Sequence, residues 1–291
     1  RREQGGTVSA EFEQFGFLGG LPLPGDYTGD GAADLAVYNL FTGDWYITPF
    51  GGPAVAFPEP FGYEGAIPVP GDWDGDGDWD LGVYDPNAGL WYAQAVGELP
   101  IIWAHQFGYY GAIPVPGDYD GDGTWDFAVY DTLYGLWYIE ASTDGILAWG
   151  TQFGYEGAIP VPGDYDGDGA WELGVYDMDG GHWYIQPIGE QPIVWAQQWG
   201  YFGTIPVPGD YDGDGDWDMA VCDQTLGVWY VKPLDDVPLV FGDQFGYAGA
   251  IPMPCTHAAF EIALDTNPSG FDAYLVPFEP VLHENPSAFD Q

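Results

Sequence analysis

Basic side chains are almost missing from this sequence. Of its 291 residues only Arg1, Arg2 and Lys232 are basic, against 46 Asp and Glu, and the formal net charge is −43 at pH 7. Nucleic acids and anionic membrane surfaces bind proteins through basic patches, so both are excluded as partners. The same shortage excludes sialidase-like enzymes, which need an arginine cluster for the substrate carboxylate. It also places a lyase of acidic polysaccharides last among the functions considered, because such a lyase needs Lys or Arg to stabilise an enolate.

Cysteine, histidine and long apolar runs are also scarce. No apolar run reaches the roughly 18 residues that a membrane-spanning helix needs, so no membrane insertion is expected. The four histidines stand at unrelated positions and no nucleophile elbow is present, which indicates a protein that is not an enzyme. Cys222 and Cys255 are too few for a disulfide framework, but each replaces a repeated residue, and we expect one disulfide between them.

Hydrophobic and aromatic residues are plentiful, and they recur with a fixed period. Hydrophobic residues make up 46% and aromatic residues 18% of the chain, which is enough for a packed core. Three patterns repeat every 46 residues: an acidic loop such as "GDYDGDGTWD", an aromatic residue followed by Gly, and the pair "WY". The loops begin at Gly25, Gly71, Gly117, Gly163 and Gly209, the second pattern at Phe15, Phe61, Phe107, Phe153, Trp199 and Phe245, and the third at Trp45, Trp91, Trp137, Trp183 and Trp229.

Each repeat contains four short segments that are typical of strands. In the third repeat they are "AIPVPGD", "DFAVYD", "GLWYIEA" and "ILAWGTQF", separated by turn residues. Four strands per repeat predict an all-β fold, a β-propeller, in preference to a parallel β-solenoid, whose repeats are usually shorter. We expect six blades within a single domain over residues 7–278, followed by a tail over 279–291. The sixth blade would be degenerate, and an N-terminal strand in residues 7–16 would complete it and close the ring.

The acidic loops place carboxylates at positions 1, 3, 5 and 9 and a glycine at position 6. This spacing suits Ca²⁺, a hard cation that takes six to eight oxygen ligands, better than Mg²⁺, which retains waters, or Zn²⁺, which prefers His and Cys. An EF-hand is excluded because position 12 of the third copy is Val129, in a predicted strand. The expected ligands are Asp26, Thr28, Asp30 and Asp34; Asp72, Asp74, Asp76 and Asp80; Asp118, Asp120, Asp122 and Asp126; Asp164, Asp166, Asp168 and Glu172; and Asp210, Asp212, Asp214 and Asp218.

The copies of the loop differ in their acids. Thr28 replaces an Asp in the first loop, which should therefore bind calcium more weakly. The sixth equivalent, "CTHAAFEIAL" from Cys255, has no acid at a ligand position and should be empty. Up to five calcium ions are therefore expected.

The stretch "GDYDGDGTWDFAVY" resembles the VCBS and FG-GAP repeats that form the propellers of integrin alpha subunits and of many bacterial extracellular proteins. The resemblance covers residues 14–245 in five units. It implies a calcium ion between the first two strands of each blade, held by Asp26, Asp72, Asp118, Asp164, Asp210 and their loop partners.

Three functions are compatible with such a propeller. The first is an extracellular recognition or scaffold module stabilised by calcium, since cytosolic free calcium is too low to fill sites of this kind. The second is a subunit of a filament or surface layer, assembled by donation of the N-terminal strand to the next copy. The third is a lectin with Trp79, Trp125, Trp171 and Trp217 stacked on sugars, although we interpret these tryptophans as covers of the loops or wedges between blades. The sequence does not identify the protein or glycan ligand.

Overall fold

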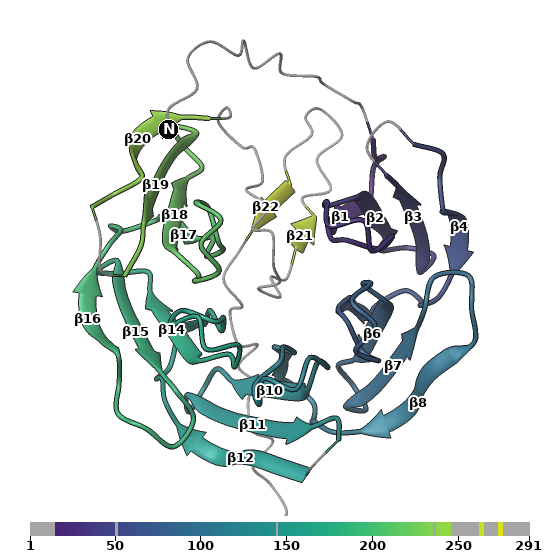
Figure 1. Ribbon diagram of the computed structural model, residues 1–291, viewed down its shortest axis with the longest axis horizontal. Coiled ribbons are helices and arrows are strands. Elements are labelled where there is room, and N and C mark those ends of the chain that lie inside the picture. The colour runs from purple at the N-terminus through teal and green to yellow at the C-terminus, as the bar shows by residue number, and fades with distance from the viewer. Residues whose placement is uncertain are drawn as a thin grey trace, which may run out of the picture.

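The computed structural model describes residues 15–245, except 50, 51, 144, 235 and 236, together with residues 262–264 and 273–275. These residues form five antiparallel sheets of four strands each and one sheet of two strands. Figure 1 shows the five large sheets arranged in a ring as the blades of a β-propeller, with the first strand of each blade nearest the centre and the fourth strand on the rim.

The strands of each blade pair in chain order. They are β1 (Gly20–Pro22), β2 (Leu35–Asn39), β3 (Asp44–Thr48) and β4 (Ala56–Pro60); β5 (Ile67–Pro68), β6 (Leu81–Asp85), β7 (Leu90–Gln94) and β8 (Pro100–Gln106); β9 (Ile113–Pro114), β10 (Phe127–Asp131), β11 (Leu136–Ala141) and β12 (Gly145–Gln152); β13 (Ile159–Pro160), β14 (Leu173–Asp177), β15 (His182–Gln186) and β16 (Val194–Gln198); and β17 (Ile205–Pro206), β18 (Met219–Asp223), β19 (Val228–Lys232) and β20 (Val240–Gln244).

The number of blades differs from the prediction. Six blades were expected, and this was wrong: the structure has five blades of four antiparallel strands each. The described part of the sixth repeat forms only two strands, β21 (Ile262–Leu264) and β22 (Ala273–Leu275), which pair with each other between the first and fifth blades in the view of Figure 1. This repeat lacks the acidic loop and the strand sequence that follows it in the other five. The expected N-terminal strand, the tail and Cys255 lie outside the described residues, so the disulfide stays a prediction.

Two of the repeated patterns meet in the core of each blade. In the third blade, the indole Nε1 of Trp137 donates a hydrogen bond of 2.6 Å to the carbonyl oxygen of Phe153. Gly154 follows with a φ of +142°, and a Cβ there would lie 2.2 Å from the hydroxyl oxygen of Tyr130. Glycine is therefore required by both backbone conformation and space. The period of the "WY" and aromatic–Gly patterns reflects this one packing arrangement.

The tryptophans of the acidic loops connect consecutive blades. The ring of Trp125 lies against Gly71 of the preceding blade, where a Cβ would be 2.1 Å from the indole. Ring centroids are 5.5 Å apart between Trp79 and Trp125, 5.3 Å between Trp125 and Trp171, and 4.8 Å between Trp171 and Trp217. These tryptophans are thus wedges between blades, as interpreted from the sequence, and not an exposed sugar-binding ring. The described residues contain no helix with the length and apolar character needed to cross a membrane.

Candidate metal centre

Each acidic loop is a compact connection between the first two strands of its blade. In the third blade, an isolated bridge between Gly117 and Asp126 closes the base of the loop. Asp118 folds the chain back on itself, because its two carboxylate oxygens accept backbone N–H bonds from Gly121 and Gly123 at 2.7 and 2.9 Å. Gly123, at position 6, has a φ of +91°, a conformation that favours glycine. The spacing seen in the sequence therefore corresponds to a turn that brings alternate side chains together.

The acid at position 9 is buried in every loop. Its side chain accepts a hydrogen bond from the backbone N–H at position 2, for example at 2.9 Å between Tyr119 and Asp126 and at 2.7 Å between Tyr165 and Glu172. Asp126 has no exposed surface and Glu172 is 2% exposed. A buried carboxylate is costly unless it is neutral or compensated by positive charge.

Burial changes the acidity of these groups. Desolvation, with repulsion from the other loop acids, raises the pKa of Asp80 and Asp126 to about 7, of Glu172 to about 8 and of Asp218 to about 6, and it also raises the pKa of Asp34. Within the described ranges none of these buried acids forms an ion pair, because the two ion pairs there join His105 to Glu140 and His182 to Asp177. The ammonium group of Lys232 donates to the carbonyl oxygens of Pro233 and Leu234 instead.

Four of the five loops bring three acids together. In each group, one ligand oxygen from each acid lies within 4.8 Å of the others, and the groups are Asp72, Asp74 and Asp80; Asp118, Asp120 and Asp122; Asp164, Asp166 and Glu172; and Asp210, Asp212 and Asp218. The donors are all carboxylate oxygens, so this donor set fits a hard divalent cation. The structure thus assembles 12 of the 20 predicted ligands into such groups.

The remaining predicted ligands serve other contacts. Asp26, Thr28, Asp30 and Asp34 of the first loop form no such group, and the Thr28 hydroxyl lies 3.4 Å from Asp34 Oδ1. At position 5, Asp76, Asp168 and Asp214 accept the backbone N–H two residues further on and so stabilise the turn. Weaker binding by the first loop stays a prediction.

The third loop has neighbours that the repeat pattern did not reveal. Ser142 donates its backbone N–H to Asp126 Oδ1 at 3.0 Å, and the hydroxyl of Thr143 donates to Asp122 Oδ2 at 2.6 Å. The third group also differs from the others, because it contains Asp122 in place of the acid at position 9, Asp126. The sequence offered a sign of these contacts, because "STDG" after the third strand carries hydroxyl groups that the equivalent segments "VGEL" and "IGEQ" of the neighbouring repeats lack.

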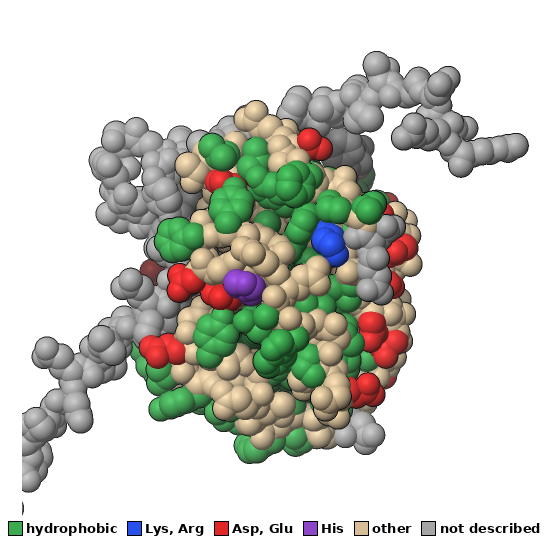
Figure 2. Space-filling view, turned by 90° about the vertical axis from the view of Figure 1, so that its left-hand side faces the viewer, with side chains coloured by type: hydrophobic (Ala, Val, Ile, Leu, Met, Phe, Trp, Pro, Cys, Tyr) green, Lys and Arg blue, Asp and Glu red, His purple; other side chains and the backbone are tan. Residues whose placement is uncertain are grey.

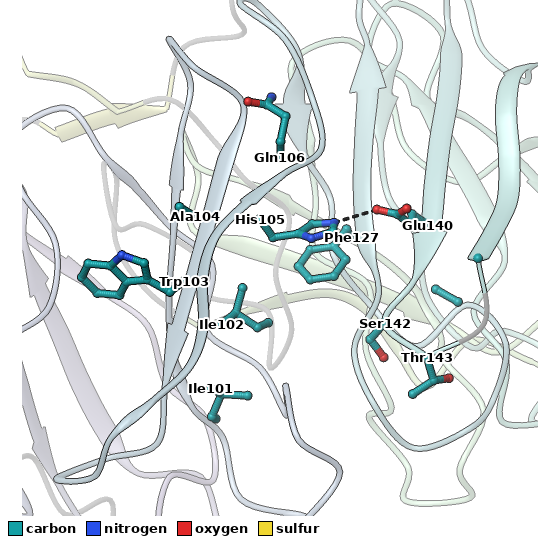
Figure 3. Close-up of a pocket in the computed structure, with 12 residues that line it drawn as sticks. Ile101, Ile102, Trp103, Ala104, His105, Gln106, Phe127, Glu140, Ser142 and Thr143 are labelled. Atoms are coloured by element: carbon teal, nitrogen blue, oxygen red, sulfur yellow. Dashed lines mark hydrogen bonds and ion pairs between the residues drawn. The ribbon is translucent and has the colours of Figure 1, made fainter.

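A separate cavity of about 570 Å³ lies between the second and third blades. Its walls include Ile101, Ile102 and His105 from β8 and Glu140 from β11 (Figure 3). His105 Nε2 is 2.7 Å from Glu140 Oε2, and the imidazole stacks on Phe127 with ring centroids 4.0 Å apart. This pair joins the second and third blades, and the cavity borders the third acidic loop, because Ser142 and Thr143 also line it.

By its fold, this protein is a β-propeller of small antiparallel sheets, and each of its five blades contains an acidic loop. No protein-family model matches the chain, and no curated protein matches it in sequence. Solved structures that resemble it include crystal structures of BBS1N in complex with ARL6DN, one soaked with mercury and the other with lead. The first is 13% identical over 84% of this chain and 70% of that chain, with a TM-score of 0.44. The second is 12% identical over 74% and 66%, with a TM-score of 0.46. This similarity concerns the fold alone.

Proposed function

We propose that this chain is a non-enzymatic, extracellular β-propeller that binds calcium in its acidic loops and serves as a recognition or scaffold module. The proposal rests on one observation above all. In three loops the side chain of the acid at position 9 is only 2–3% exposed, and one of its oxygens lies within 4.8 Å of an oxygen from each of two further acids. These acids form no ion pair with a basic side chain in the described part of the chain. A bound divalent cation would compensate this charge and hold the acids ionised, whereas the described residues offer them backbone N–H groups but no basic side chain.

Calcium is favoured over other cations by the donors and by the sequence. The ligands are oxygens only, whereas Zn²⁺ and copper sites usually contain His or Cys. The loop backbone is a series of turns with several carboxylates, which suits the flexible, oxygen-rich coordination of calcium better than the strict octahedron of Mg²⁺. The resemblance of "GDYDGDGTWDFAVY" to VCBS and FG-GAP repeats supports the same ion.

The expected role of calcium is to stabilise the ring. Extracellular calcium modules have dissociation constants of about 10⁻⁴ to 10⁻³ M, so a site at the tight end contributes about 1.4 kcal/mol at ~1 mM calcium. Four such sites would contribute about 6 kcal/mol, which is comparable with the total stability of many domains. Such sites fill only where free calcium is near the millimolar range, and this supports an extracellular location.

Calorimetric titration of the EGTA-treated chain with calcium tests the proposal. We expect saturable binding with about four ions per chain, one for each group of acids. Asp166→Asn should reduce the stoichiometry by one, whereas Glu156→Gln, which removes one charge from the same repeat outside the loop, should leave it unchanged. Absence of saturable binding, or an Asp166→Asn variant with unaltered stoichiometry, would overturn the proposal.

A further inference from the structure

An exposed aromatic side chain stands at the same place on the outer strand of every blade. The five residues are separated by 46 positions and are 68–73% exposed: Phe57, Trp103, Trp149, Trp195 and Phe241. Core packing does not account for them, since the aromatic residues of the "WY" and loop patterns already fill the spaces within and between the blades. Single exposed apolar residues are ordinary, but an exposed aromatic at the same position of all five blades, each beside a further aromatic ring, points to binding.

The backbone of the outer strands is distorted where these side chains project. The pairing of the third and fourth strands shifts register beside Tyr92, Tyr138, Tyr184 and Tyr230, which face the exposed aromatics. The residue after the aromatic then has a positive φ: Ala104 (59°), Gly150 (65°), Ala196 (54°) and Gly242 (74°). Alanine rarely adopts this conformation, and such strain is retained where a side chain must be directed to a particular place. In Figure 3, Trp103 accordingly projects from the side of β8 opposite to His105.

Each exposed aromatic contacts the tyrosine of the neighbouring third strand, on the side face of its blade; the surface between two consecutive blades at this level is called a groove below. Where the second and third blades meet, the ring centroids of Trp149 and Tyr138 are 5.4 Å apart, and the ring of Phe107, from the preceding linker, lies 6.3 Å from that of Trp149. Tyr109 lies 5.9 Å from Tyr138 and donates its hydroxyl to Asp131 Oδ2 at 2.7 Å. The wall therefore combines aromatic faces with a hydroxyl and a carboxylate.

The same arrangement recurs in neighbouring grooves. Tyr184 contacts both Tyr155 and Trp195, with centroids 6.5 and 5.3 Å apart. Tyr230 likewise contacts Tyr201 and Phe241, at 5.9 and 5.5 Å. Between the second and third blades, Glu140 lies on the same face of β11 as Tyr138 and lines the cavity with His105 and Trp103. These sets are equivalent sites at regular intervals around the rim.

The chemistry of these grooves fits a carbohydrate. Flat aromatic faces next to hydroxyl and carboxylate groups match the apolar face and the hydroxyl edge of a sugar ring. Figure 2 shows hydrophobic side chains in separate patches with polar and acidic surface between them, unlike the continuous apolar surface of an obligate protein interface. A net charge of −43 disfavours anionic glycans, and equivalent sites around a rim suit a ligand that itself repeats.

We propose that the grooves between consecutive blades bind neutral polysaccharides, with sugar rings stacked on the exposed aromatic side chains of the outer strands. This inference rests on the rim of the propeller and is independent of calcium binding by the loops. Engagement of several grooves by one polymer raises the apparent affinity beyond that of a single site, by a factor of about 10² or more.

Affinity electrophoresis of the full chain in native gels tests this inference. The gels contain galactomannan, xyloglucan or a soluble β-glucan as neutral probes, and alginate as an anionic control. We expect retardation by at least one neutral polysaccharide and none by alginate. Trp149→Ala should weaken retardation about two- to tenfold, and the triple variant Trp103→Ala/Trp149→Ala/Trp195→Ala, which keeps only Phe57 and Phe241, should weaken it much further.

Two controls separate stacking from other effects. Tyr134→Ala removes an aromatic ring that is 61% exposed in the β10–β11 turn, outside the grooves, and should change nothing. Trp149→Phe should retain binding, and near-UV circular dichroism checks that each variant is folded.

Unaltered mobility of the wild type in all three neutral polysaccharides, or equal retardation of the triple variant and the wild type, would overturn the inference. Self-association that the triple variant abolishes, seen by sedimentation velocity, would also overturn it by assigning the grooves to a second copy of the chain. The gels are repeated with calcium and with EGTA, so that a lack of polysaccharide binding can be distinguished from a lack of calcium binding.

Discussion

The backbone N–H of Trp125 donates a hydrogen bond of 2.8 Å to the carbonyl oxygen of Asp72. Trp125 belongs to the acidic loop of the third blade, and Asp72 is the first acid of the loop in the second. Equivalent bonds join Trp79 to Asp26, Trp171 to Asp118 and Trp217 to Asp164. Each of the first four loops is therefore held by the next one, and an ion that ordered one loop would also support its neighbour.

Loss of one wedge should destabilise the ring strongly. Trp125 is 6% exposed, and Trp125→Ala should lower the free energy of unfolding by about 3–5 kcal/mol, because it leaves a large cavity between two blades. Trp149→Ala makes the same chemical change in the same blade at a residue that is 68% exposed, and its cost should be much smaller. Denaturant unfolding followed by circular dichroism measures both values, and similar costs for the two variants would contradict the wedge interpretation.

Restoring the missing acid of the first loop should create a stronger calcium site. Thr28→Asp gives this loop the acid that the other four loops have at position 3. In ~1 mM calcium the variant should be more stable than the wild type by up to about 1.4 kcal/mol. In EGTA it should be less stable, because the new carboxylate lies close to Asp34. Melting curves under both conditions test this reversal of sign, and a shift in the same direction in both would contradict the role of calcium in these loops.

Buried tyrosines should make the fold sensitive to alkali. Burial raises the pKa of Tyr38, Tyr84 and Tyr176 to about 12, compared with about 10 in an unfolded chain. Below pH ~10 the hydroxyls are protonated in both states, and their contribution to stability is fully present. As the pH rises from about 10 to 12, the unfolded state loses these protons first, so stability falls.

Ultraviolet absorbance of tyrosinate, recorded together with circular dichroism, follows this transition. The buried tyrosines should ionise only as the protein unfolds, and Tyr84→Phe should move the alkaline midpoint to higher pH because it removes one of the ionising groups. Tyrosinate formation by these residues in a protein that remains folded at pH ~10 would contradict the prediction.

The two glycines of one linker should respond differently to alanine. Gly154 has a φ of +142° and no room for a Cβ beside the Tyr130 hydroxyl, whereas Gly157 has a φ of +85° and nothing within 4 Å of a Cβ. Gly157→Ala should cost about 1–2 kcal/mol from backbone strain alone. Gly154→Ala should cost clearly more, because Tyr130 must also move. Thermal unfolding of the two variants gives the comparison, and equal costs would show that the Tyr130 contact is unimportant.

Local features of the molecule followed from the sequence. The period of 46 gave the positions of the strands, and the segment "DFAVYD" corresponds to β10 (Phe127–Asp131). The acids at positions 1, 3 and 9 converge in three loops because consecutive turns between them are encoded by Asp and Gly within a few residues. Such features depend on neighbours in the chain, and a repeated pattern reveals them five times over.

Features that depend on distant residues were decided by the tertiary structure. The number of blades depends on the twist of each sheet and on the packing of one sheet against the next, and no single repeat specifies either. Asp126 is not in the acid group of the third loop, and it accepts a hydrogen bond from Ser142 of another turn instead. The alternation of a strand says which residues share a face, but the irregularity beside Tyr138 and Gly150 changes that face, so the exposure of Trp149 could not be predicted from its position. The sequence by itself determined the repeat, its strands and its acidic loops, whereas packing between blades decided the size of the ring and which aromatic side chains remain on its surface.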